Sequence, residues 1–196
     1  MPAQPHDASL VWTAWGALSV PRKYLGEPLV AAHACKKHVR YRYYVSRSLQ
    51  HDPDRPSAEG LRIPALEIEA AVIQGIADAL DDPLTLLTRA GIPLESASLR
   101  IIFNKAKHLA SAVRAKQRDA IRDVVAKVIA ARGTISVELS VAALCKALAI
   151  DLAPNAPPAI TITSPVRLTR TGRAVQLVQR DGRPVTQGKP DPGQDK

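Results

Sequence analysis

The sequence contains few of the residues on which small disulfide-bonded or metal-bound domains depend. Only two of its 196 residues are cysteines, Cys35 and Cys145, and they lie far apart. Two cysteines cannot build a disulfide framework or a four-cysteine zinc site. Aromatic residues are also scarce, at 4% of the chain. We therefore expect a core of leucine, isoleucine, valine and alanine, in a protein that works in a reducing compartment.

Long apolar runs and a secretion signal are missing as well. The sequence has no run of about 18 apolar residues, the length that a membrane-spanning helix needs. Its first 20 residues have neither a basic start nor a continuous apolar segment, so we do not expect a signal peptide. These observations predict a cytoplasmic protein without a membrane span.

Acidic residues are outnumbered, with 18 Asp and Glu against 27 Lys and Arg, for a net charge of +9. The basic residues concentrate in 22–62, 100–132 and 167–196, whereas 64–82 is acidic and contains no basic residue. Such a surplus favours a polyanionic partner but indicates no reaction. No catalytic constellation is evident, so we predict neither an enzyme nor a cofactor.

The pattern of the chain predicts an α+β fold with a ribbon-like β-hairpin, amphipathic helices and a small C-terminal antiparallel β element. We divide the sequence into a disordered leader, a basic hairpin, a helical region, a small α+β region and a disordered tail, at residues 1–21, 22–62, 63–132, 133–180 and 181–196. The proline-rich composition of the two ends is the reason for expecting disorder there.

The hairpin should consist of strands over Tyr24–Ala31 and Val39–Leu49, joined by a basic connector at residues 34–38. Alternation in the second strand predicts an aliphatic and aromatic face and a polar, basic face. The first face would carry Val39, Tyr41, Tyr43 and Val45, and the second Arg40, Arg42, Tyr44 and Ser46.

The helical region should begin at Pro64, since proline suits the first turn of a helix. Glu67 and Glu69 fit the positive end of the helix dipole. The expected buried stripe of this helix is Leu66, Ile68, Val72, Ile73, Ile76 and Leu80. A short turn or helix over Leu84–Ala90 should follow. We then expect a long amphipathic helix over residues 95–123, with an apolar stripe from Leu99 to Val113 and a basic opposite face.

For the remaining residues we expect a β-hairpin around Gly133, although a helix reaching Arg132 is an alternative. A short apolar helix over Val141–Ile150 and two strands, Ala159–Arg170 and Arg173–Gln179, complete the pattern.

Basic side chains and tyrosines interleave along residues 36–47. Cations of this kind can neutralise phosphates, and planar rings can pack on sugars or bases. The alternative is an exposed edge strand whose arginines prevent association with another sheet. Composition alone does not separate these two interpretations.

The run HACKKHVRYRYYVSR at 33–47, followed by GLRIPALEIEAAV at 60–72, resembles the C-terminal region of bacterial serine site-specific recombinases of the large, resolvase-related kind. VELSVAALCKALAI at 137–150 and PVRLTRTGRAVQLV at 165–178 are also similar to that group. The resemblance implies a DNA-binding module without the catalytic domain, and it predicts DNA as the partner. The expected DNA contacts are Lys36, Lys37, Arg40, Arg42 and Arg47, with Tyr41, Tyr43 or Tyr44 packing on DNA and alternation placing Tyr44 beside the arginines.

Three further expectations remain open beside this interpretation. Many serine recombinases bind zinc at this hairpin with pairs of cysteines. Here the only other ligand candidates near Cys35 are His33, His38 and the more distant His51, so we predict no metal site. The chain could instead be the inactive remnant of a disrupted recombinase gene. It could also be an interaction module that pairs with a full-length recombinase, or with itself, through the helix expected at 95–123.

Overall fold

Helices and two β-sheets make up the part of the chain that the computed structural model describes, which confirms the α+β class. The described residues are 18–19, 29–36, 39–47, 62–131, 133–171 and 174–179. The expected disorder of the leader and tail therefore falls mostly outside them. Leu18–Ser19 is an exception, because these two residues form strand β1 and pair in parallel with β5.

The larger sheet has the strand order β1-β5-β6-β7-β8, with β5 at Val125–Ala131, β6 at Thr134–Ser140, β7 at Ala159–Thr171 and β8 at Ala174–Gln179. From β5 onward neighbouring strands are antiparallel. The hairpin expected around Gly133 is confirmed, and this glycine has a φ of 92°. The alternative of a helix reaching Arg132 is wrong, because β5 begins at Val125.

The smaller sheet has the order β2-β3-β4, with β2 at Leu29–Lys36, β3 at Val39–Ser46 and β4 at Arg62–Pro64. The predicted hairpin is confirmed, and its first strand includes residues that were assigned to the connector. Residues 24–28 of the expected first strand lie outside the described residues. Strand β4, which pairs with β3 immediately before the first long helix, was not expected from the sequence.

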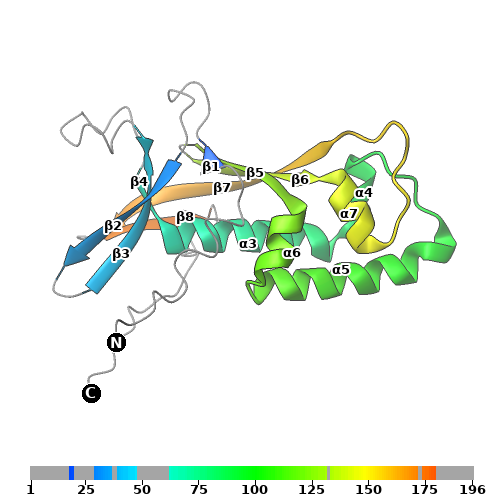
Figure 1. Ribbon diagram of the computed structural model, residues 1–196, viewed down its shortest axis with the longest axis horizontal. Coiled ribbons are helices and arrows are strands. Elements are labelled where there is room, and N and C mark those ends of the chain that lie inside the picture. Colours follow the sequence, from blue (N-terminus) through cyan, green and yellow to red (C-terminus); the bar gives the residue numbers. More distant parts are fainter. Residues whose placement is uncertain are drawn as a thin grey trace, which may run out of the picture.

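Helix α3 (Ala65–Asp81) runs below β5, β6 and β7 in Figure 1, and it contacts strands of both sheets. Its expected buried residues are confirmed except for Leu66, which is 62% exposed. Two residues correspond to about 200° of rotation around a helix, so Leu66 points away when Ile68 is fully buried. Helix α4 (Pro83–Arg89) follows, as expected, and the Asp82 side chain caps it by accepting from the Thr85 N–H at 3.2 Å.

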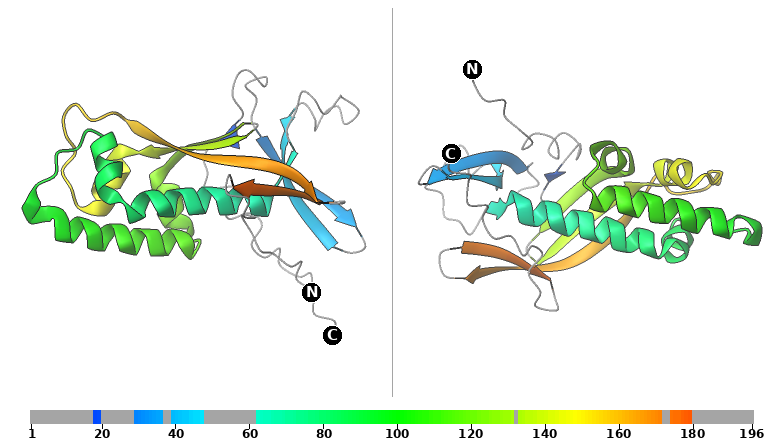
Figure 2. Two further views of the ribbon diagram at one scale, coloured as in Figure 1. Left: turned by 180° about the vertical axis from the view of Figure 1, so that it is seen from behind. Right: turned by 90° about the horizontal axis from the view of Figure 1, so that it is seen from below.

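The single helix expected over 95–123 is wrong. The chain forms a 3-10 turn (Ser96–Ser98), helix α5 (Leu99–Arg114) and helix α6 (Arg118–Val124). The break falls at Lys116, whose φ of 57° is incompatible with a right-handed helix. Figure 2 shows α5 lying alongside α3.

The apolar stripe of α5 packs inside the chain. Its buried members are Ile102, Ala106, Ala110 and Val113. They belong to one core with residues of α3, both sheets and helix α7 (Val141–Leu148). Much of this stripe is therefore covered by the chain itself, but Phe103, which also belongs to it, is 44% exposed. Pairing with a second chain through this helix stays a prediction.

Candidate nucleic-acid interface

The three-stranded sheet has one face on the core, and its opposite face, here called the outer face, is exposed at Tyr41, half-buried at Tyr43 and buried at Val45. Residues that pair directly across antiparallel strands share a face, and successive residues alternate between faces. Leu29, Tyr44 and Ile63 lie on the inner face and are at most 3% exposed. Tyr41 and Tyr43 must therefore lie on the outer face.

A buried polar cluster joins the inner face of this sheet to α3. The Arg42 Nη2 atom lies 2.6 Å from each carboxylate oxygen of Glu69. The Tyr44 hydroxyl donates to Glu69 Oε1 at 2.9 Å. The Arg42 and Glu69 side chains are only 17% and 10% exposed, so these contacts replace water around groups that would be costly to bury alone.

Burial dominates the titration of this cluster. It raises the pKa of Glu69 by more than the neighbouring Arg42 and the hydrogen bonds lower it. Burial, together with the adjacent Glu69 carboxylate, raises the pKa of the Tyr44 phenol far above its ordinary value. Tyr44 is therefore a permanent hydrogen-bond donor, and Glu69 is its acceptor.

Tyr41 and the pair formed by Tyr43 and Arg62 occupy the outer face. The Tyr41 side chain is 40% exposed. The guanidinium carbon of Arg62 lies 5.6 Å from the centroid of the Tyr43 ring, within the range of a cation–π contact. Arg62 is itself exposed, so an accessible ring and an accessible cation share one face of the sheet.

The structure separates the predicted DNA contacts. Tyr44 is fully buried and held by Glu69, which corrects its assignment as a residue that packs on DNA. Arg42 lies in the same cluster, whereas Arg47 is exposed. The backbones of Lys36 and Arg40 are described but their side chains are not, and Lys37 lies outside the described residues; for these three the expectation stays a prediction.

The roles of Glu69 and Arg62 were not predicted from the sequence. Glu69 was explained as a charge at the helix start, but it is 8% exposed and binds the hairpin. A signal was present, because Glu69 precedes Val72, Ile73 and Ile76 by three, four and seven residues and so lies on the apolar stripe. Arg62 gave no signal, since β4 itself was not foreseen.

Helix α5 offers a second basic surface. Residues 99–118 contain six Lys and Arg and no acidic residue. Arg100, Lys105, Lys107 and Lys116 are exposed, while Arg114 pairs with Asp81 of α3. The four exposed cations are thus accessible to a polyanion.

Two observations on the described residues concern metal sites and membrane-spanning helices. Among these residues no group of three or more His, Cys, Asp or Glu is arranged to hold a metal ion. His33 and Cys35 are exposed, and His38 and His51 lie outside the described residues. No described helix combines the length and apolar character that spanning a bilayer requires.

The comparisons with known proteins supply no relative for this chain: no protein-family model, curated protein or solved structure matches it.

Proposed function

We propose that the chain binds DNA through the outer face of the three-stranded sheet. The observation that carries the proposal is the exposed Tyr41 beside the stacked pair of Tyr43 and Arg62. Rings of this kind stack on bases or pack on sugars, and arginines contact phosphates or stack in turn. Arg47, at the end of β3, adds an exposed cation.

The buried cluster supports this assignment by fixing which face is outward. A one-residue slip of β3 would exchange the two faces of the strand. Arg42 and Tyr44 are bound to Glu69 on the inner side, so Tyr41 and Tyr43 are held on the outer side. The function is one of binding rather than catalysis.

The recombinase interpretation remains part of the proposal. The two runs on which the resemblance to serine recombinases rests, at 33–47 and 60–72, include strand β3, strand β4 and the start of helix α3. DNA in the cytoplasm would then be the ligand, and a full-length recombinase acting at the same site would be the protein partner.

Fluorescence anisotropy with a labelled 30-base-pair duplex and the matching single strand tests the proposal. Stacking contributes about 1–3 kcal/mol per base, so Tyr41→Ala should weaken binding about tenfold, and Tyr41→Phe should restore most of it. Arg62→Ala should reduce the slope of log K against log salt by about one.

Arg122→Ala is the matched control for charge, because it removes the same charge from α6, where Arg122 pairs with Asp119 at 3.0 Å. It should leave the affinity nearly unchanged. If Tyr41→Ala and Arg62→Ala bind like the unmodified chain, the sheet is not the interface. If only the double variant Arg100→Ala with Lys107→Ala loses DNA binding, the interface lies on α5.

A further inference from the structure

Strand β7 has an edge that no described strand occupies. Its first half pairs with β6, from Ala159 to Pro165, and its second half pairs with β8. In an antiparallel strand, successive residues direct their N–H and C=O groups to opposite edges. The Val166 N–H donates to Gly133 at 2.9 Å on the β6 side. Thr161 and Thr163 therefore direct their backbone groups to the opposite edge.

One of these edge groups already accepts a bond from outside the sheet. The Arg89 Nη2 atom of α4 donates to the Thr161 carbonyl at 2.7 Å. Thr161 and Thr163 are exposed, and the Thr163 N–H and C=O point to the same edge without a described strand beside them. Pro165, which has no N–H, ends this open stretch.

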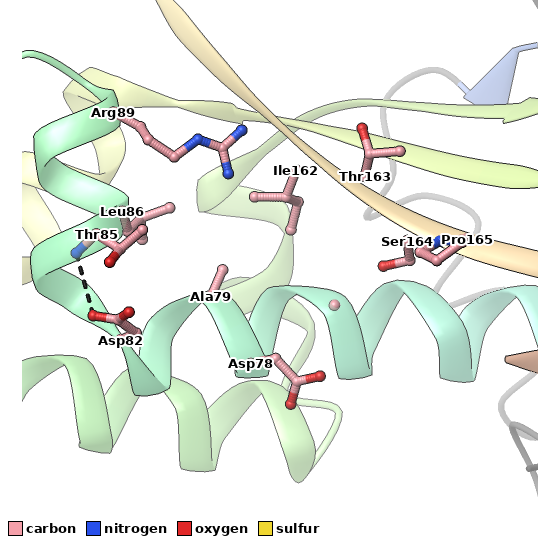
Figure 3. A pocket seen from close by; sticks show the side chains of 11 residues that line it. Asp78, Ala79, Asp82, Thr85, Leu86, Arg89, Ile162, Thr163, Ser164 and Pro165 are labelled. Atoms are coloured by element: carbon pink, nitrogen blue, oxygen red, sulfur yellow. Dashed lines mark hydrogen bonds between the residues drawn. The ribbon is translucent and has the colours of Figure 1, made fainter. Parts of the chain in front are cut away.

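A cavity of about 530 Å³ adjoins the open edge, between β7, α3 and α4. Figure 3 shows Arg89 and Leu86 on one side and Ser164 on the other, with Ala79 on the floor. At Gly75 the helix approaches the strand so closely that a Cβ atom would lie 2.8 Å from Ser164 Oγ. The volume lies in the range of sites that bind small ligands or side chains.

The cavity is acidic in a chain whose net charge is +9. Asp82 and Asp78 line it together with Arg89. The Asp78 side chain lies at the rim, below α3 in Figure 3, and its carboxylate accepts from Gln74 Nε2 at 2.6 Å. Hydrogen bonds from Thr85 lower the pKa of Asp82, which keeps that carboxyl ionised near neutral pH. Two carboxylates against the single guanidinium of Arg89 leave the cavity with a small surplus of negative charge.

We propose that the open edge of β7 binds an extended basic peptide from a partner protein. The peptide adds as a strand beside Thr161–Pro165, exchanging backbone hydrogen bonds with Thr163, and it places an arginine or lysine side chain in the cavity near Asp78 and Asp82. Strand addition of this kind takes its affinity from the main chain and its specificity from the pockets beside the edge. The site is separate from the outer face proposed for DNA.

The probe is a fluorescein-labelled peptide, Thr-Val-Arg-Val-Thr-Val, titrated into the full chain. We expect saturable binding of this peptide. The same peptide with Glu in place of Arg should bind with an affinity at least about tenfold lower. Asp78→Asn with Asp82→Asn should remove this preference while keeping the cap of α4, because Asn also caps helices. Asp151→Asn, an exposed carboxyl outside the cavity, is the control and should preserve the preference.

Thr163→Pro tests the edge directly. It removes only an N–H that β6 does not use, so circular dichroism should stay unchanged while peptide binding is lost. If this variant does not fold, a peptide with an N-methyl group at the residue facing Thr163 gives the same test with the unmodified chain. Amide exchange at Thr163 should slow when the peptide is added.

Equal affinity for the Arg and Glu peptides, or full binding by Thr163→Pro, would overturn the proposal. So would slow exchange of the Thr163 amide in the protein alone, because the edge would then be paired already. None of these results depends on whether the chain binds DNA.

Discussion

Arg42 of β3 and Glu69 of α3 are joined through a single nitrogen that lies 2.6 Å from both carboxylate oxygens. The two residues are 27 positions apart in the sequence, and each was first given another role, as a phosphate contact and as a helix-start charge. Their contact fixes the smaller sheet on the first long helix. It also decides which face of the basic strand is left for a partner.

Removal of Glu69 should destabilise the fold. Glu69→Ala leaves Arg42 and the Tyr44 hydroxyl without their shared acceptor, and breaking a buried pair in this way costs about 3 kcal/mol. Urea unfolding measures the change. Gln74→Ala, at an exposed position of the same helix, should stay within about 0.5 kcal/mol of the unmodified chain. Equal losses for the two variants would show that the cluster adds no stability.

The stability of the chain should also depend on pH through Glu69. Burial raises the pKa of this carboxyl above its ordinary value, so the folded chain binds the proton more tightly than the unfolded chain. The contribution of Glu69 is then full below its unfolded pKa and is lost as pH rises through the raised pKa.

Glu69→Gln, which cannot titrate, is the reference for this effect. The difference in unfolding free energy between the unmodified chain and Glu69→Gln should fall as pH rises from about 4 to about 8. A difference that grows over this range would mean that Arg42 outweighs burial and holds the pKa down.

Two substitutions of alanine by glycine, one within α7 and one just after it, should have opposite effects on the stability of the chain. Ala149 ends this helix with a φ of 55°, where glycine avoids a steric cost of about 1 kcal/mol. Ala147→Gly, within the helix, should instead lower stability by about 1 kcal/mol. Thermal unfolding of both variants gives the comparison. A loss of stability in Ala149→Gly would contradict the left-handed conformation.

The close approach of Gly75 to Ser164 should appear in a double-mutant cycle. Alanine is favoured over glycine in a helix by about 1 kcal/mol, but a Cβ at residue 75 would lie 2.8 Å from Ser164 Oγ. Gly75→Ala alone should therefore raise the free energy of unfolding by less than the same substitution does in a chain that also carries Ser164→Ala. Urea unfolding of the four chains measures this coupling. Strict additivity would mean that the strand does not touch the helix here.

Local patterns predicted most of the elements correctly. Pro64 gave the start of α3, because proline suits the first turn of a helix. Alternation gave β3, and the glycine turn gave the hairpin of β5 and β6. These features depend on a few neighbouring residues, which a sequence shows directly.

The candidate site was predicted less well. Alternation correctly grouped Arg42 with Tyr44, but it could not show that this face packs against α3. Arg62 reaches Tyr43 only because β4 pairs with β3, and such long-range pairing leaves no local pattern. The helix break at Lys116 was also missed, since nothing in residues 115–117 forbids a helix.

The sequence by itself determined the α+β class, the aliphatic core, the basic surplus and the interleaving of cations and tyrosines along one strand. Only the tertiary structure decided which of those side chains are interior and which are available. Burying a charge requires a partner of opposite charge, and Glu69 provides it from another element. Arg42 and Tyr44 therefore serve the fold, while Tyr41, Tyr43 and Arg62 remain at the surface.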